Sequence, residues 1–231
     1  MDFFDSLIRD ASVYLNRFSQ KKIAFTPEKC WQENEYSHVI LQRDTAFELD
    51  GTGFNLVTSS EVQDEIIVIG DDLDSIKGKR KFARICIVQL DTEDDEQKYY
   101  NLIRKIDYIK YHFFPEGYMI RTSSRAHKEA VRVAKSAIKK GVSFERVGNQ
   151  LISKYKNNPS VKGVKVLFVT DEKVDFSLLE EIAEKNKSIA EALNHVINNV
   201  TFDCDSCNLK AVCDEVEGMK ELHFKNAQKG M

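Results

Sequence analysis

Two runs of aliphatic and β-branched residues limit most strongly what this chain can fold into. Residues 65–70 read Glu-Ile-Ile-Val-Ile-Gly, and residues 84–90 read Arg-Ile-Cys-Ile-Val-Gln-Leu. Apolar runs of this length without alternation are typical of strands that are buried on both faces of a sheet. A further strand is predicted at residues 161–170. Cys86 lies inside the second run and is therefore interpreted as a core thiol.

Segments with helical periodicity alternate with these strands. They are residues 3–18, 99–113, 125–138, 144–155 and 178–197. Ser143 is predicted to cap the fourth helix, and Ser177 with Glu180 forms a predicted capping box for the fifth. The segment after Ser123 and Ser124 is interpreted as a basic helix that buries its alanines. This alternation favours an α/β fold in which helices flank a mixed sheet.

The first sixty residues are predicted to contain shorter elements. Residues 36–42, 46–49 and 54–58 have the composition of strands, and Asp50-Gly51 is predicted to form the turn between the last two. The chain is therefore divided into three parts. They are an N-terminal helix with short strands at residues 1–60, an α/β domain at residues 61–200 and a cysteine module at residues 201–231.

Composition narrows the class of protein. The 231 residues carry a formal net charge of -3, so binding to nucleic acid would need a segregated basic face and is not expected. No apolar run reaches about 18 residues, and residues 1–18 carry charges throughout, so neither a membrane span nor a secretory signal is predicted. A cytoplasmic location is expected.

The strongest chemical signal is a group of cysteines near the end of the sequence. Three of the five cysteines, Cys204, Cys207 and Cys213, are spaced C-x2-C-x5-C. In a reducing compartment this crowding indicates a metal site rather than a disulfide framework. Three sulfur ligands favour an iron–sulfur cluster of the 4Fe-4S type over zinc. Three unligated thiols are the alternative.

A tetrahedral site or a four-iron cluster needs a fourth ligand. The candidates within this chain are His223, which lies shortly after Cys213, and the distant Cys30. Cys30 would join the two ends of the chain, whereas a zinc ion would be held by the three clustered cysteines and His223. An iron left open for a substrate or for a ligand from a partner is the third arrangement.

Two groups of charged residues give weaker signals. Asp71, Asp72 and Asp74 follow a buried strand, where they could hold a hard divalent ion or form a solvated acidic turn. The basic segment 77–81 could bind a phosphate-bearing cofactor or remain a solvated loop. The candidate cofactor ligands are Lys79, Arg80, Arg121 and Arg125. The five histidines lack HExxH or H-x3-H spacing, so hydrolytic chemistry has no support.

An ordered series of strings is more specific than any one motif. Residues 65–76 read Glu-Ile-Ile-Val-Ile-Gly-Asp-Asp-Leu-Asp-Ser-Ile, and further strings stand at residues 116–118, 140–148, 151–155 and 164–172. Together they resemble the acetyl-CoA synthase beta-subunit family, whose EIxVIGxDxDS stretch the first string matches, over roughly residues 60–213. The resemblance implies that the central region binds coenzyme A. It also implies a four-iron cluster bridged to two nickel ions in the following domain, with Cys204, Cys207 and Cys213 as cluster ligands.

Departures from the family pattern limit the expected activity. The family has a longer spacing after the first cysteine pair, a fourth cluster cysteine and a later Cys-Gly-Cys that holds the distal nickel, and none of these occurs in the 231 residues. The resemblance therefore implies a truncated iron–sulfur protein of anaerobic one-carbon metabolism, acting with a protein partner as an accessory, electron-transfer or assembly subunit. The alternative is a non-catalytic interaction module with a structural zinc site. The cysteine spacing also resembles that of cluster-stapled nucleases, but no acidic-lysine nuclease core accompanies it.

Overall fold

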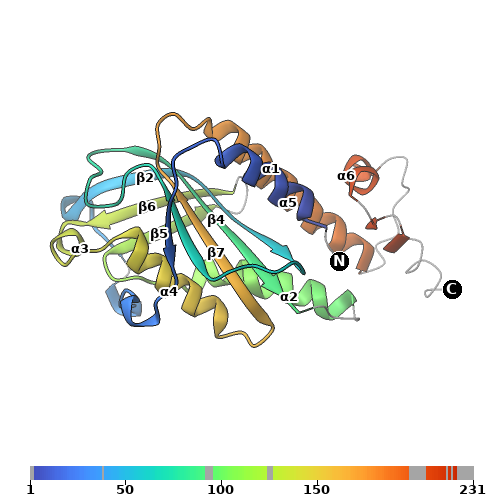
Figure 1. Cartoon of the computed structure of the whole chain (residues 1–231), viewed down its shortest axis with the longest axis horizontal. Coiled ribbons are helices and arrows are strands. Elements are labelled where there is room, and N and C mark those ends of the chain that lie inside the picture. The colour runs from blue at the N-terminus through green and yellow to red at the C-terminus, as the bar shows by residue number, and fades with distance from the viewer. Residues whose placement is uncertain are drawn as a thin grey trace.

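A single sheet forms the centre of the molecule (Figure 1). The computed structural model describes residues 3–37, 39–91, 96–123, 127–197, 207–216, 218–219 and 221–222. The strands are β1 Lys21–Ala24, β2 Thr45–Thr58, β3 Glu65–Ile69, β4 Arg80–Leu90, β5 Tyr118–Ser123, β6 Lys128–Ala134 and β7 Val161–Val169. These seven strands are ordered β1-β3-β7-β4-β2-β6-β5. The pairs β2–β4 and β3–β7 are parallel and the other neighbouring pairs are antiparallel, so the sheet is mixed.

Helices cover both faces of this sheet. They are α1 Asp5–Leu15, α2 Glu96–Tyr108, α3 Lys135–Lys139, α4 Phe144–Lys156, α5 Phe176–Ile197 and α6 Lys210–Glu215. Short 3-10 helices occur at Pro27–Lys29 (η1), Glu35–Ser37, Gln42–Asp44 and Ile109–His112. The architecture is therefore the predicted α/β fold with helices flanking a mixed sheet.

The two helical layers can be assigned from side chains of β2. Tyr155 of α4 and Asp107 of α2 both bond to Asn55, which places these two helices on one face. Thr58 lies an odd number of residues further along the strand, so its side chain points to the other face, where it donates to Asp5 of α1. α5 packs against α1 and β2 on that second face (Figure 1).

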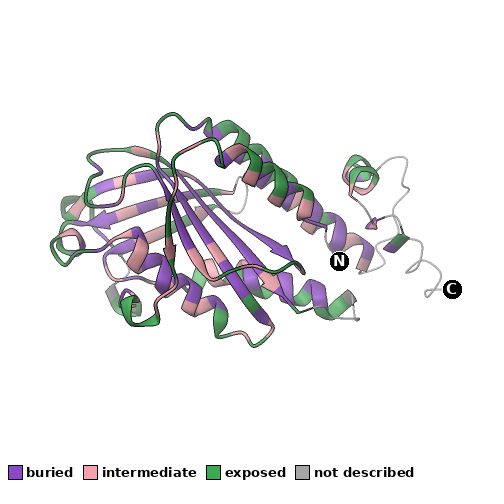
Figure 2. Ribbon diagram, viewed as in Figure 1, coloured by how far each residue is buried: buried purple, intermediate pink, exposed green. Residues whose placement is uncertain are grey.

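Burial explains why the central strands are apolar throughout. Residues 66–69 of β3 and residues 82–88 of β4 are all buried, because helices cover them from both sides (Figure 2). The strands predicted at residues 65–70, 84–90 and 161–170 are confirmed. In the described residues, no helix is both long enough and apolar enough to cross a bilayer.

The basic helix predicted at residues 125–138 is wrong. β6 occupies Lys128–Ala134 instead, followed by the short helix α3. Burial alternates along β6, with Glu129, Val131 and Val133 buried and the residues between them partly exposed. The apolar residues fit a period of 2 as well as a period of 3.6, and pairing of β6 with both β2 and β5 decides the outcome.

The hairpin predicted around Asp50-Gly51 is also wrong, because β2 runs without a break from Thr45 to Thr58. A Cβ on Gly51 would lie 1.7 Å from the carbonyl oxygen of Phe82 in β4. Gly51 therefore allows the backbones of β2 and β4 to approach closely and does not form a turn. The strand predicted at residues 36–42 is replaced by the two 3-10 helices at Glu35–Ser37 and Gln42–Asp44.

The helices predicted at residues 3–18, 99–113, 144–155 and 178–197 are confirmed as α1, α2, α4 and α5, with shifted ends. Ser143 caps α4 as predicted, accepting a hydrogen bond from Arg146 N at 3.2 Å. α5 begins one residue before the predicted cap, and Asp175 accepts the N–H and the hydroxyl of Ser177. These two bonds lower the pKa of the Asp175 carboxyl. The N-cap of α5 is therefore Asp175 and not the predicted Ser177.

Candidate functional site

An ion pair is buried in the middle of the sheet. Arg84 on β4 and Glu129 on β6 lie on either side of β2 and are 1% and 0% exposed. Arg84 Nε donates to Glu129 Oε1 at 2.8 Å, and Nη2 donates to Oε2 at 2.7 Å. Burial alone would lower the pKa of Arg84, but the charge of Glu129 outweighs it and holds that pKa well above its ordinary value. The guanidinium therefore stays charged inside the sheet.

Gly53 leaves room for this ion pair. The strand register places Gly53 opposite Arg84 and places Gly51 opposite Glu129. A Cβ on Gly53 would lie 2.1 Å from Glu129 Oε2. The carboxylate therefore crosses β2 through the space that a side chain would otherwise fill, and only glycine permits it.

Asn55 extends the ion pair into a network of buried hydrogen bonds. Its Oδ1 accepts from Tyr155 OH at 2.7 Å and from Arg84 Nη1 at 3.3 Å. Its Nδ2 donates to Asp107 Oδ1 at 3.1 Å. Arg84 Nη1 also lies 3.0 Å from Cys86 Sγ, whose pKa is raised by burial and lowered in turn by the guanidinium charge. The prediction that Cys86 is a core thiol is confirmed, since it is fully buried.

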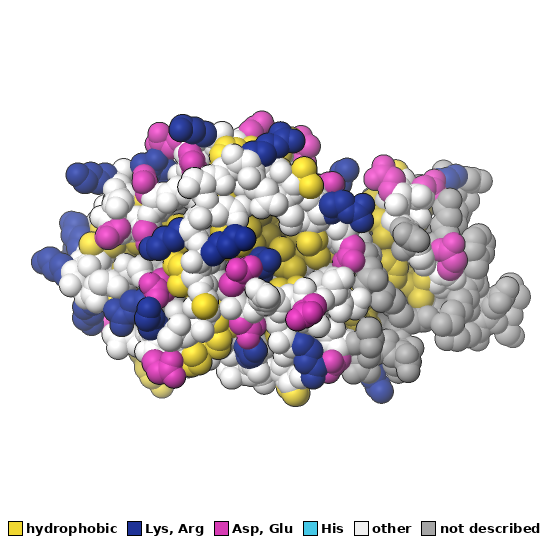
Figure 3. All heavy atoms as spheres, viewed as in Figure 1, with side chains coloured by type: hydrophobic (Ala, Val, Ile, Leu, Met, Phe, Trp, Pro, Cys, Tyr) yellow, Lys and Arg dark blue, Asp and Glu magenta, His cyan; other side chains and the backbone are white. Residues whose placement is uncertain are grey.

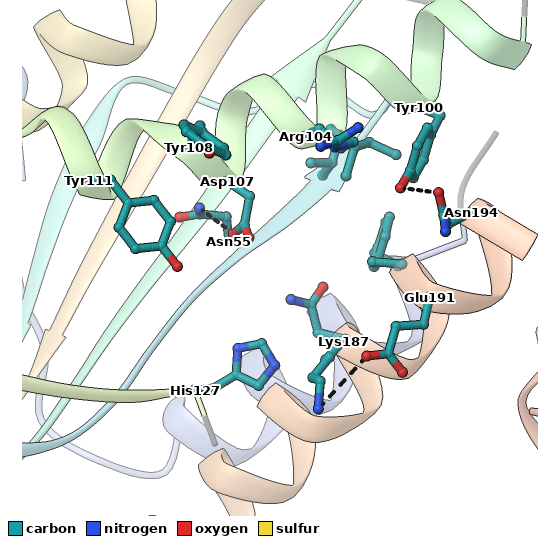
Figure 4. A pocket seen from close by; sticks show the side chains of 15 residues that line it. Asn55, Tyr100, Arg104, Asp107, Tyr108, Tyr111, His127, Lys187, Glu191 and Asn194 are labelled. Atoms are coloured by element: carbon teal, nitrogen blue, oxygen red, sulfur yellow. Dashed lines mark hydrogen bonds and ion pairs between the residues drawn. The ribbon is translucent and has the colours of Figure 1, made fainter. Parts of the chain in front are cut away.

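A cavity of about 310 Å³ opens beside Asn55, between α2 and α5 (Figure 4). Asn55 and Val57 of β2 line it, beyond Thr52, where the pairing of that strand with β6 ends. Tyr100 of α2 and Asn194 of α5 close one end through a hydrogen bond of 2.8 Å. The cavity is therefore framed by two helices from opposite faces of the sheet, with the buried network as its inner wall.

His127 points into this cavity from the turn before β6 (Figure 4). Its backbone φ of +44° lies in the left-handed region, which histidine adopts more often than most residues. Its carbonyl oxygen accepts from Gly53 N at 3.1 Å and from Thr52 Oγ1 at 3.0 Å, which holds the turn against β2. Burial, followed by the charge of Lys110, lowers the pKa of the imidazole. The ring is therefore neutral at pH 7.

The sequence matches a known protein family. The family model of the CO dehydrogenase/acetyl-CoA synthase complex beta subunit matches residues 22–174, which is more than half of the sequence. The chain belongs to this family. A search of curated proteins finds no match.

The matched region of the beta-subunit family coincides with the sheet. It contains all seven strands apart from the first residue of β1, together with α2, α3 and α4. The resemblance was expected over roughly residues 60–213. The match begins earlier, at residue 22, and ends before Cys204, Cys207 and Cys213. The buried network lies inside the matched region, whereas α5, which forms one wall of the cavity, lies outside it.

The residues expected to bind a cofactor in this beta-subunit family member lie near the start of β4. Lys79 and Arg121 line a hollow of about 210 Å³, and Lys79 also lines a second hollow of about 510 Å³ with Arg80 and Lys81. Arg80 is paired with two carboxylates, at 3.5 Å from Asp71 and at 2.5 Å from Glu172. Arg125 lies outside the described residues. Three of the four candidates are thus brought to one surface.

Charge on the surface is mixed rather than segregated. Figure 3 shows Lys and Arg side chains interspersed with Asp and Glu on the face in view. Within the described residues, Lys79, Lys81 and Arg121 have no carboxylate at ion-pair distance. Recognition of an anion would therefore depend on such local groups of free cations.

The candidate metal ligands are only partly described. Cys207 and Cys213 are half-buried and lie before and within α6, which packs on α5. Cys204 and His223 lie outside the described residues. No group of three or more potential ligands converges in the part of the chain that the structure describes.

Cys30 lies elsewhere, directly after η1, which packs on α4. Ser153 of α4 bonds to its thiol, and partial burial raises its pKa. α4 and α5 cover opposite faces of the sheet, so the structure does not bring Cys30 next to Cys207 or Cys213.

The acidic turn after β3 has a structural role. Asp72 Oδ1 accepts from Leu73 N at 2.7 Å and from Phe144 N at 2.8 Å, which ties the turn to the first residue of α4. Asp71 pairs with Arg80, and Asp74 accepts from Ser75 Oγ at 3.0 Å. In this arrangement the three carboxylates serve local bonds rather than one shared ion.

Sequence reasoning missed both the buried network and the cavity. Arg84 stands at the head of an apolar run, and a charge there signals a buried partner. Glu129 falls within the segment that was interpreted as a basic helix with buried alanines, so the sequence pattern did not identify it as that partner. The cavity joins Asn55, Arg104, His127 and Asn186, which come from four separate elements, and no local pattern in the sequence links them.

Proposed function

We propose that this member of the beta-subunit family binds a phosphate-bearing cofactor of the coenzyme A type and acts as an accessory, electron-transfer or assembly subunit of a one-carbon complex. The observation that carries the cofactor proposal is the position of Lys79, which lines two hollows at once. Lys81 and Arg121 flank it without a carboxylate partner in the described residues. Free cations at a hollow are suited to phosphate groups.

Arg80 has a different part in this proposal. Because Asp71 and Glu172 already neutralise its guanidinium, it orders the loop rather than contacting the ligand. Lys79 and Arg121 supply the unneutralised charge, and their side chains contact the phosphates. Arg125 would add a fourth cation from the segment after β5.

Calorimetric titration of the whole chain with coenzyme A and with pantetheine tests this proposal. We expect coenzyme A to bind and pantetheine, which lacks the phosphates, to bind far more weakly. Lys79→Ala should weaken coenzyme A binding by about three- to tenfold, the usual size of one exposed charge contact. Lys185→Ala removes an exposed lysine of α5 away from both hollows and is the matched control. Equal affinity for the two ligands would refute the proposal.

We further propose that Cys204, Cys207 and Cys213 ligate an iron–sulfur cluster at the C-terminal end. The turn before α6 supports this, since Lys210 N donates to the carbonyl of Cys207 and Cys213 N donates to the carbonyl of Leu209. These two bonds close two successive turns of the backbone between Cys207 and Cys213. The candidates for the fourth ligand are His223, a residue of a partner and Cys30, and the position of Cys30 beside α4 favours the first two.

Anaerobic purification with iron, sulfide and zinc analysis and a visible spectrum tests the cluster. About four irons and four sulfides per chain are expected, and Cys207→Ser should abolish them. Cys30→Ser serves as a comparison, and retention of the cluster there would exclude Cys30 as a ligand. One zinc without sulfide would instead support the second candidate, an interaction module whose metal fastens α6 to α5.

A further inference from the structure

The cavity between α2 and α5 has the size and lining of a small-molecule site. Its volume of about 310 Å³ lies within the range of natural ligand pockets. An apolar floor is formed by Phe4, Val57 and Ile103. None of its lining residues lines the two hollows around Lys79, so it is a separate site.

Three polar side chains at this cavity have hydrogen-bonding capacity to spare. His127 Nε2 is buried and has no hydrogen-bond partner among the described residues. Asn186 of α5 is 8% exposed, and nothing in the described chain bonds to its amide. The guanidinium of Arg104 lies 6.0 Å from the ring centre of Tyr100 and has no carboxylate at ion-pair distance within the described residues. Three elements thus direct an unused polar group toward one space.

Of these three groups, the buried Nε2 of His127 is the one that is costly to leave without a partner. A buried donor or acceptor without a partner destabilises the fold, and most such groups in folded proteins are paired. The neighbouring polar residues show the contrast, since Asp107 accepts a hydrogen bond from Asn55 and pairs with Lys110. A bound ligand would supply the partner that His127 Nε2 lacks, with Asn186 and the exposed Arg104 beside it to bond to further polar atoms.

The rim of the cavity is aromatic. Tyr108 and Tyr111 contact each other edge to face, with ring centres 5.5 Å apart, and are 57% and 40% exposed. Figure 4 shows both rings on the α2 side of the cavity, across from Lys187. Lys187 is held between Glu184 and Glu191 at 3.5 Å and 3.8 Å, so Arg104 is the cation left for an incoming charge. Exposed tyrosines at a mouth favour stacking against a flat ring.

We propose that this cavity binds a small organic anion with a flat ring. Arg104 pairs with the anionic group, the tyrosine rim stacks on the ring, and Asn186 and His127 bond to polar atoms at its inner edge. The site is independent of the proposed cofactor surface and of the cysteines.

Three commercially pure probes test the proposal on the full chain by ligand-detected NMR and calorimetry. Nicotinate carries a flat ring, a carboxylate and a ring nitrogen, nicotinamide lacks the charge, and benzoate lacks the nitrogen. We expect millimolar or tighter binding of nicotinate, with nicotinamide about three- to tenfold weaker because the charged contact with the exposed Arg104 is lost.

Arg104→Ala should weaken nicotinate binding by the same factor and leave nicotinamide binding unchanged. Lys105→Ala, the adjacent exposed residue on α2 that does not line the cavity, is the matched control and should bind as the wild type does. Circular dichroism verifies that both variants are folded. Failure of all three probes to bind the wild type, or equal binding of nicotinate by the Arg104→Ala variant, would overturn the proposal.

Discussion

The two sides of Asn55 hold polar groups in opposite states. On the inner side, Arg84 and Glu129 are buried and bonded to each other, and the buried Tyr155 bonds to Asn55. On the outer side, His127 Nε2 has no hydrogen-bond partner among the described residues. Hydrogen bonds among the buried groups fix the geometry of the sheet. A polar group without a partner can instead bond to a ligand. Substitutions on the two sides should therefore affect different measurements.

Removing the charge of Glu129 should have the largest effect. Glu129→Gln leaves the Arg84 guanidinium buried without its counter-charge, which costs about 3–5 kcal/mol of unfolding free energy. Urea denaturation measures the loss. Glu48→Gln is the matched control, since Glu48 of β2 pairs with Arg132 of β6 at 2.8 Å but in partial contact with solvent. Its loss should stay below about 1 kcal/mol. Equal losses would mean that burial does not set the strength of the inner network.

Removing one hydroxyl from the inner network should cost less. Tyr155→Phe deletes the hydrogen bond to Asn55 while Arg84 continues to bond to the same oxygen, so about 1 kcal/mol is expected. Tyr14→Phe removes a hydroxyl that bonds to the backbone of Asp175 at the surface and should have a smaller effect. Thermal and urea unfolding of both variants measure the difference. A larger loss for Tyr14→Phe would contradict the comparison.

Acidification should reveal the imidazole of the outer region. The pKa of His127 is lower in the folded chain than in the unfolded chain, so the unfolded chain binds the proton more readily and stability falls as pH drops below about 6.5. The charges that act on it are those of Lys110, Asp107, Glu184 and Lys187. The effect should be smaller than that of Tyr155→Phe, because solvent screens a half-exposed ring.

His127→Asn keeps a residue that tolerates the left-handed backbone and removes the titrating group. The slope of unfolding free energy against pH between 7 and 5 should decrease in this variant. An unchanged slope would show that other groups carry the whole pH dependence.

Arg104→Ala should have the smallest effect on stability, within about 0.5 kcal/mol, because the side chain is exposed. Its effect on nicotinate binding should nevertheless be measurable, at about three- to tenfold. A substitution that leaves unfolding unchanged and weakens binding would separate the outer region from the inner one. A large loss of stability would instead place Arg104 among the residues that hold the fold.

Features that depend on neighbouring residues in the sequence could be predicted, whereas features that depend on contacts between distant strands could not. Residues 66–69 and 84–88 could be assigned to strands because each run carries its own burial signal. Gly51 and Glu129 could not be understood locally, since the glycine admits the backbone of Phe82 and the glutamate reaches across β2. Glycine is typical of turns and glutamate of surfaces, but here each makes a contact that forms only after distant strands pair.

The same distinction holds for the candidate sites. Lys79, Arg80 and Arg121 were predicted from charge patterns, and the structure brings them to one surface. Arg104, His127 and Asn186 share no pattern, because a cavity between helices of opposite layers depends on how the two layers meet at the free edge of β2. The cysteine motif differs from both. Its spacing in the sequence predicts a metal site, but two of the five candidate ligands, Cys204 and His223, lie outside the described residues.

The position of β7 governs how this protein can assemble. β7 lies between β3 and β4, although about 70 residues of chain separate β4 from it, so it is the last strand of the sheet to leave the ribosome. Until then β3 and β4 each present an open edge to other chains. The sheet should therefore form late and as a unit, with slow kinetics typical of long-range pairing. Fragments that end before residue 161 should aggregate.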